Sequence, residues 1–312
     1  MRAFLFPGQG SQAVGMGVLL RDASRAARDV FEQVDEALGQ NLFRIMRDGP
    51  DDELRLTENA QPAIMANSLA VFAALTREGG VDLAKAAQFV AGHSLGEYSA
   101  LCAAGSFDLA TTAKLLKLRG QAMQAAVPVG VGAMAALLGA DLELAQKIAD
   151  AAAQGEVCAV ANDNDPGQVV LSGHKGAIDR AIEMAKEMGA KRAISLPVSA
   201  PFHCSLMQPA AEAMQDALSY VVVEEPAVPV YANVVAAPIT DPDAIRSLLV
   251  DQVTGLVRWR ETILEMVAAG VEDFVELGGK VLGPMVKRTA PDVKVTSVVT
   301  IGDVEALAKE IA

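Results

Sequence analysis

The chain has 312 residues, 52% hydrophobic and 21% charged, a composition typical of a folded globular protein. Its 26 basic and 39 acidic residues leave a net charge of −13, which argues against a nucleic-acid partner. No stretch approaches the ~18 uninterrupted apolar residues of a membrane span, and the first apolar run is too short for a signal peptide.

The chain opens with a short apolar run, residues 2–6, which predicts a buried strand. The loop that follows, "GQGSQA", formally matches G-x-G-x-x-A, the turn of a dinucleotide-binding unit. That unit needs a second strand within ~30 residues, ending in an acidic residue. Residues 22–39 have a helical pattern instead, and Asp35 and Glu36 fall inside it. The sequence therefore argues against a dinucleotide site.

A loop is expected around residues 48–52, then a long apolar helix over 59–80 with Pro62 tolerated in its first turn. The stretch 86–105, "AAQFVAGHSLGEYSALCAAG", passes from an apolar strand directly into a helix. Helical pattern then continues in pieces to about residue 126.

The next segment, residues 127–199, predicts a different unit. Its expected order is strand, helix, two strands around the turn "DNDPG", helix and strand, which is the ferredoxin-like arrangement. We therefore expect an α/β protein with a large, discontinuous catalytic domain, 1–126 and 200–312, and an inserted ferredoxin-like β-α-β-β-α-β subdomain, 127–199. In the resumed large domain we expect strands at 228–233 and 273–277 and helices at 205–219, 243–250 and 259–269.

Cysteine and histidine are scarce. Cys102, Cys158 and Cys204 show no C-x-x-C pairing, so we expect reduced thiols and a cytoplasmic location. The three histidines have no metal-ligand spacing, and we expect no metal.

A candidate nucleophile lies in "GHSLG", a G-x-S-x-G match between the strand and the helix. A serine on such a sharp turn sits in strained backbone, and small neighbours let the turn close. The helix start aims backbone N–H groups, first that of Leu95, at the place where an oxyanion would form. The alternative is a tight turn in which Ser94 only caps the helix.

Ser94 needs a base. His93 is adjacent, so its side chain should diverge, and we interpret it as structural. His174 falls at a hairpin-to-helix junction. His203, in "VSAPFHCSLM", follows a proline and so lies on a loop where the chain re-enters the large domain, which favours it as the base. Its neighbour Cys204 is a poorer nucleophile candidate.

Four ordered stretches carry a family resemblance: "FPGQGSQ", "GHSLGEYSAL", "LRGQAMQ" and "PFHCSLM". They resemble the malonyl-CoA:acyl carrier protein transacylases and the related acyltransferase domains of fatty acid and polyketide synthases, from residue 3 to about residue 290. The fold implied is an α/β-hydrolase-like domain with a parallel sheet and a nucleophile elbow, plus the inserted subdomain.

The resemblance also implies a function and its site. Malonyl would pass from malonyl-CoA through a Ser94 ester to the phosphopantetheine thiol of acyl carrier protein, for fatty acid synthesis, with no cofactor besides the coenzyme A thioester. The implied residues are the pair Ser94 and His203, oxyanion donors Gln9 and Leu95, Arg119 for the malonyl carboxylate, and the carbonyl of Gln252 to orient His203. The family often has Asn-Pro where "TGL" follows Gln252 here, so that loop is expected to differ.

Arg119 also stands out without the resemblance. It lies 25 residues after Ser94, so an antiparallel return of the chain would bring it back to the nucleophile. A planar guanidinium suits a carboxylate, which lysine would not reproduce. We place Phe202 and Met123 in the pocket, and Phe202 resembles malonyl-selective members, whereas serine there is more usual in relatives for branched units.

Several alternatives remain. An acidic carrier protein would need a local basic patch, and the candidates are Lys186, Lys191 and Arg192 or Lys280, Lys287 and Arg288.

The same chemistry would also serve a polyketide pathway, which the sequence does not separate from fatty acid synthesis. A serine thioesterase or hydrolase is less favoured because no HGGG-type loop precedes Ser94, and an inactive scaffold need keep none of these residues. No heptad pattern demands a partner, so a free-standing monomer is the default, without nucleic acid or membrane.

Overall fold

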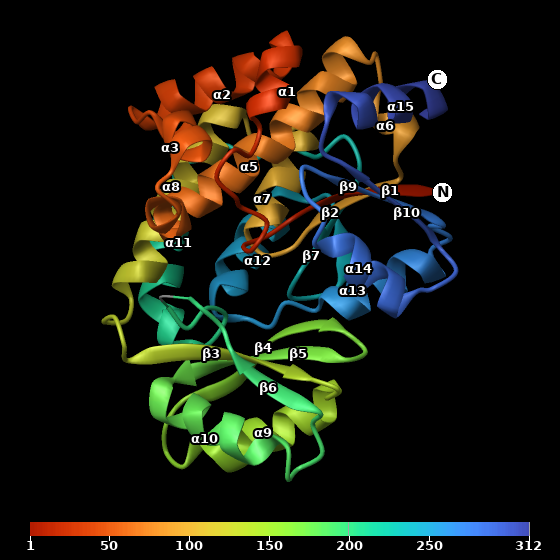
Figure 1. Cartoon of the computed structure of the whole chain (residues 1–312). Helices are drawn as coiled ribbons and strands as arrows, with labels where there is room; N and C mark the ends of the chain where they lie inside the picture. The colour runs from red at the N-terminus through yellow and green to blue at the C-terminus, as the bar shows by residue number, and fades with distance from the viewer. Residues whose placement is uncertain (199, 312) are drawn as a thin grey trace.

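The computed structural model describes residues 1–198 and 200–311. Two sheets organise the chain, one in the larger upper body and one in the smaller lower body of Figure 1. The larger sheet has the order β10-β9-β1-β2-β7-β8, in which only β8 is antiparallel to its neighbour. Its strands are β1 (Arg2–Phe6), β2 (Phe89–Gly92), β7 (Val230–Ala232), β8 (Ala237–Ile239), β9 (Asp273–Leu277) and β10 (Lys294–Val298).

Helices cover both faces of this sheet because its central strands are apolar on both sides. In β1, Phe4 and Phe6 join one buried cluster, whereas Ala3 and Leu5 join another. The first cluster packs beneath α1 (Val18–Ala23), α2 (Arg25–Leu38), α3 (Leu42–Asp48), α4 (Asp51–Arg55), α5 (Thr57–Ala73), α7 (Leu95–Ala103), α8 (Leu109–Ala125), α11 (Gln208–Ser219), α12 (Pro242–Thr254) and α15 (Ile301–Ile311). The second packs against α13 (Trp259–Ala268) and α14 (Leu282–Thr289).

The smaller sheet is antiparallel and has the order β4-β5-β3-β6. Along the chain its elements are β3 (Gly132–Leu138), α9 (Leu142–Ala153), β4 (Cys158–Asp165), β5 (Gln168–His174), α10 (Lys175–Ala185) and β6 (Arg192–Ser195). Both helices cover its lower face (Figure 1), and residues of the other face, such as Met134 and Val170, join the core of the larger body. The subdomain edge expected at residue 199, and residue 312, lie outside the described residues.

Two expectations near the N-terminus are wrong. The loop expected over 48–52 is shorter, because α4 already begins at Asp51, where three acidic residues in the first turn favour the helix N-terminus. The next helix begins at Thr57 rather than residue 59, which puts Pro62 beyond the first turn. Three short elements complete the structure: the π-helix η1 (Ala74–Glu78), α6 (Leu83–Ala86) and the 3₁₀ helix η2 (Ser205–Met207).

Within the described ranges, no helix combines the length and the apolar character needed to cross a bilayer. Cys102, Cys158 and Cys204 are all free thiols.

Candidate active site

Ser94 occupies a sharp turn between β2 and α7, at the carboxyl edge of the central strands. Its backbone is strained, with φ 53° and ψ −112°. Two glycines make the turn possible. A Cβ on Gly92 would lie 1.9 Å from the carbonyl of Gly96, and one on Gly96 would lie 2.2 Å from the carbonyl oxygen of Phe6. Only glycine fits at either position, so the turn presses directly against the end of β1.

His203 faces the serine from the loop before η2. The serine hydroxyl and His203 Nε2 are 2.8 Å apart, and His203 Nδ1 lies 2.8 Å from the carbonyl oxygen of Gln252. A carbonyl only accepts, so Nδ1 carries the proton in that bond and Nε2 is left to accept from the hydroxyl of Ser94. The expected Ser–His pair and the expected orienting carbonyl are thus brought together.

Burial and the charge of Arg119 lower the pKa of His203 to about 3, and His203 is only 4% exposed. The imidazole is therefore neutral around neutral pH. A neutral imidazole with a free Nε2 lone pair can take the serine proton.

Arg119 returns to the nucleophile along α8, as the antiparallel path predicts. Its Nη2 donates to Ser94 Oγ at 3.2 Å and to Gln252 Oε1 at 2.9 Å, and Nη1 donates to Gln61 Oε1 at 2.9 Å. The side chain is 1% exposed, and its Nε has no hydrogen-bond partner in the described part of the chain. Burial lowers the pKa of Arg119, yet a guanidinium stays charged. No salt bridge to it is found among the described residues.

The loop after β1 lies beside the elbow. A Cβ on Gly8 would come within 2.6 Å of the carbonyl oxygen of His93, so the loop backbone touches the turn itself. Gln9 lines the pocket above Ser94. Leu95 is the first residue of α7, where a backbone N–H has no acceptor within the helix. Both expected oxyanion donors therefore flank the nucleophile.

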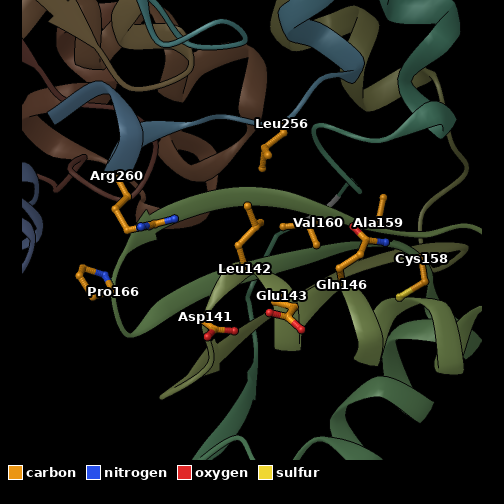
Figure 2. Close-up of a pocket in the computed structure, with 10 residues that line it drawn as sticks. All are labelled: Asp141, Leu142, Glu143, Gln146, Cys158, Ala159, Val160, Pro166, Leu256 and Arg260. Carbon is orange, nitrogen blue, oxygen red and sulfur yellow. The ribbon is translucent and has the colours of Figure 1, made fainter. Parts of the chain in front are cut away.

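The pocket above Ser94 has a volume of about 240 Å³. It brings together the expected residues Gln9, Ser94, Arg119, Met123, Phe202 and His203, whereas Leu95 and Gln252 are not among the residues that line it. A larger hollow of about 860 Å³ lies between α9, β4 and the segment that carries Leu256 and Arg260 (Figure 2). Neither Ser94 nor His203 lines that hollow. Among the described residues, no group of three His, Cys, Asp or Glu side chains could hold a metal ion.

His93 also lines the pocket, but its contacts are with residues other than Ser94 and His203. Its Nε2 lies 2.8 Å from Asn164 Oδ1, and its ring meets the edge of Trp259 at 5.5 Å between centroids. These contacts fit the structural role that its adjacency to Ser94 predicts.

Three polar residues around the site were missed by sequence reasoning. Gln61 holds one end of the Arg119 guanidinium. Asn233, just after β7, accepts from the backbone N–H of Ser94 at 2.7 Å and donates to the carbonyl of Gly92 at 2.8 Å. Glu97, one helical turn after Ser94, accepts from Asn233 N at 3.0 Å and from Gln252 Nε2 at 2.8 Å. Only Glu97 had a signal in the sequence, namely its place beside the G-x-S-x-G turn.

Residues 3–302 match the model of the acyl transferase domain family. The malonyl CoA-acyl carrier protein transacylase of Escherichia coli strain K12 is 43% identical over 92% of this chain and 92% of its own length. That of Bacillus subtilis strain 168 is 44% identical over 95% of this chain and 92% of its own length.

Solved structures agree. The acyl-carrier-protein S-malonyltransferase of Bartonella henselae superposes with a TM-score of 0.97 at 52% identity over 99% of both chains. A malonyl-transacylase solved in complex with its type II polyketide synthase acyl-carrier protein superposes with a TM-score of 0.95 at 38% identity, again over 99% of both chains. The chain therefore belongs to the acyl transferase family, among the malonyl-CoA:acyl carrier protein transacylases.

Proposed function

We propose that this enzyme transfers malonyl from malonyl-CoA to the phosphopantetheine thiol of an acyl carrier protein, through an ester on Ser94 Oγ. One observation carries the proposal: a hydroxyl bonded to a neutral imidazole also touches a buried guanidinium. The nucleophile, its base and an anion-binding group thus share one small pocket.

In the first half-reaction, His203 Nε2 takes the Ser94 proton as Oγ attacks the thioester carbonyl. The N–H groups of Gln9 and Leu95 stabilise the oxyanion, and losing one such donor typically costs ~2.7–4 kcal/mol of barrier. As the tetrahedral intermediate collapses, the C–S bond breaks and the imidazolium returns its proton to the coenzyme A sulfur.

The second half-reaction runs the same steps in reverse. The thiol of the carrier protein gives its proton to His203, attacks the malonyl-serine ester and releases the Ser94 hydroxyl. No cofactor is needed, because each half-reaction exchanges one acyl bond for another by nucleophilic attack and proton transfer, without oxidation or reduction. The cycle is therefore ping-pong.

Arg119 binds the malonyl carboxylate in this scheme. A buried cation is costly, and the Arg119 guanidinium has no direct salt bridge among the described residues, so the carboxylate of a bound malonyl group would stabilise its charge. Phe202 and Met123 would limit the room beside the carboxylate.

The carrier protein is the expected partner, by likeness to relatives that are named for it. Of the two basic patches, Lys287 donates to two backbone carbonyls and Arg288 pairs with Asp165, so their donors are partly engaged. We favour Lys186, Lys191 and Arg192, which are all exposed. The strand that carries Arg192 leads into Leu196, which lines the pocket.

We interpret the larger body, 1–126 and 200–312, as an α/β-hydrolase-like domain and the segment 127–199 as a ferredoxin-like insert. A cytoplasmic monomer that works in fatty acid synthesis is our proposal for its setting. Likeness to a malonyl-transacylase from a type II polyketide system supports that pathway as the second candidate.

Intact-protein mass spectrometry after brief incubation with malonyl-CoA, acetyl-CoA or methylmalonyl-CoA tests the function, with Ser94→Ala as control. We expect a malonyl adduct that is absent in the variant and that discharges onto acyl carrier protein. Steady release of coenzyme A without an adduct would indicate a thioesterase. Neither adduct nor release would indicate an inactive scaffold.

A further inference from the structure

Glu97 is a buried carboxylate that touches none of the reacting atoms. It lies on α7, three residues after the nucleophile, and is 1% exposed. A single oxygen, Oε2, accepts from the side-chain amide of Gln252 and from the backbone N–H of Asn233. Burial raises the pKa of Glu97 to about 7. A carboxyl group is costly to bury, so its retention beside the nucleophile calls for a role.

The first partner, Gln252, connects Glu97 to the base and to the anion-binding group. The Gln252 amide that donates to Glu97 also donates to the Ser94 carbonyl at 3.0 Å. Its amide oxygen accepts from Arg119, and its backbone carbonyl accepts from His203. Because the side-chain amide of Gln252 is planar, hydrogen bonds that hold its nitrogen also fix the direction of its oxygen. Glu97 thereby fixes the acceptor that orients the Arg119 guanidinium.

The second partner, Asn233, connects Glu97 to the elbow. Its side chain holds Ser94 N and Gly92 O, on both sides of the strained turn. Strained backbone persists only where surrounding contacts over-determine it. By fixing the Asn233 backbone, Glu97 supports the clamp that keeps Ser94 at its position.

We propose that Glu97 is a positioning residue for acyl transfer, which sets the placement of Arg119, His203 and Ser94 through Gln252 and Asn233. This inference rests on the proposed function of Ser94 and Arg119. Because Gln252 lies between Glu97 and Arg119, the effect of Glu97 should be larger for malonyl than for acetyl. A residue that only stabilised the fold would affect both acyl groups equally.

The test compares Glu97→Met with Glu97→Gln in the full-length enzyme. Methionine has a similar size but offers only the weak acceptor of a thioether, whereas glutamine offers an amide oxygen that can replace Oε2. Single-turnover acylation of Ser94 by malonyl-CoA and by acetyl-CoA is followed by mass spectrometry and normalised to the final acylated fraction.

We expect Glu97→Met to slow malonyl acylation about tenfold to hundredfold, the effect of losing a hydrogen bond to a charged group. The malonyl-to-acetyl rate ratio should fall with it. Glu97→Gln should restore the malonyl rate to within about threefold.

Glu276→Gln is the matched control. Glu276 is equally buried but holds only the backbone N–H groups of Val281, Leu282 and Gly283 at the start of α14. Its variant should lose stability and keep the malonyl-to-acetyl ratio. Should Glu97→Met fail to fold by circular dichroism, Glu97→Ala replaces it under the same criteria.

The outcomes separate the two proposals. A wild-type enzyme that forms no adduct on Ser94 would overturn the proposed function itself. If the wild type forms the adduct and a folded Glu97→Met keeps both the wild-type malonyl acylation rate and the wild-type malonyl-to-acetyl ratio, only the role of Glu97 would be overturned. The same holds if glutamine fails to rescue, since the hydrogen bonds would then not be what matters.

Discussion

Arg119 Nη2 lies 3.2 Å from Ser94 Oγ, although Arg119 is on α8 and Ser94 is on the turn before α7, 25 positions earlier in the chain. The guanidinium is buried and is held from both ends by the amide oxygens of Gln61 and Gln252. Its charge is thus fixed beside the nucleophile, where we propose that the free carboxylate of a malonyl group binds.

Arg119→Ala should therefore lower kcat/KM for malonyl-CoA about tenfold to hundredfold, the worth of a charge-assisted hydrogen bond in this setting. Acetyl-CoA has no free carboxylate, so its transfer should change much less. Arg119→Lys should fall between, because an ammonium keeps the charge but cannot reproduce the planar pair of donors. Steady-state transfer to carrier protein measures all three. Equal losses for both acyl groups would remove Arg119 from carboxylate binding.

Glu97 makes the stability of the enzyme depend on pH in one direction. Its pKa is about 7 in the folded protein and has an ordinary value of 4.5. Between these values the folded state keeps a proton that the unfolded state loses. The contribution of Glu97 to the free energy of unfolding should therefore fall as pH rises from 4.5 to 7, by up to about 1.4 kcal/mol per pH unit. Because His203 contributes an opposite slope below pH 6.5, the Glu97 contribution is measured as the difference between wild type and Glu97→Gln in urea unfolding at several pH values. A difference that does not change with pH would mean that Glu97 is not the titrating group.

His203 acts in the opposite direction. Its pKa falls from an ordinary value of 6.5 to about 3, chiefly through burial. The unfolded state then binds the extra proton, so stability should be lost as pH falls from 6.5 towards 3. His203→Ala should flatten the loss of stability below pH 4.5 in the same urea series, and between pH 4.5 and 6.5 it should expose the opposite slope of Glu97, which the histidine otherwise offsets. If the loss below pH 4.5 is as steep in His203→Ala, the buried histidine does not account for it.

The size of the acyl pocket gives a separate prediction. Phe202 is 7% exposed and lines the pocket with Met123. Phe202→Ala should enlarge the space beside the nucleophile and raise the methylmalonyl-to-malonyl ratio of kcat/KM about tenfold or more, since a methyl group is worth ~1–3 kcal/mol in an apolar pocket. Competition between the two thioesters, read as the Ser94 adduct mass, measures the ratio. Leu206→Ala, on a half-buried residue that is not among those lining the pocket, is the control and should keep the wild-type preference.

The parts of the site that are formed by neighbouring residues in the chain could be predicted from the sequence. Gly92 and Gly96 lie where other backbone segments pass too close for a side chain, and Gly8 lies against the backbone of His93. Glycine at these positions is visible in the sequence, so the turn at Ser94 and the loop that touches it could both be predicted.

His203 was singled out because the chain has only three histidines. Arg119 was singled out because the family resemblance implies it and an antiparallel return of the chain would bring it to Ser94. Asn233 and Gln61 were not found, because their contacts with Ser94 and Arg119 span 139 and 58 residues. No local pattern marks an amide that a distant strand end or helix will bring into place.

The fold shows the same division. Strands buried on both faces, such as β1 and β9, were predicted from their apolar runs. The two edge strands of the larger sheet were not predicted. β8 has only three residues and is half-exposed, and β10 is largely half-exposed, so neither carries a strong apolar signal. The helices α14 and α15 were missed with them. The stretch "DNDPG" was expected to form the turn between two strands, yet β4 continues through Asp165, and Asp163 and Asp165 are buried in ion pairs with arginines of the larger body.

Those ion pairs lead to the last prediction. Asp163 pairs with Arg260 of α13, and Asp165 pairs with Arg288 of α14, while both carboxylates lie on β4 with 3% and 1% exposure. Arg288→Ala would leave the Asp165 carboxylate buried and unpaired, which should cost about 1–3 kcal/mol in the free energy of unfolding. Lys294→Ala is the control, because its pair with Glu310 is half-exposed and should be worth less than about 1 kcal/mol.

The ion pairs should also affect catalysis, because Asn162, which lines the pocket, and Asn164, which holds His93, lie on the same strand as the two carboxylates. Arg260→Ala should therefore lower kcat/KM as well as stability, whereas Lys294→Ala should leave kcat/KM unchanged. Urea unfolding and malonyl transfer, measured on the same preparations, would show whether the two losses occur together. A loss of stability without any change in kcat/KM would mean that the pairs hold the two bodies together but do not set the position of β4 beside the nucleophile.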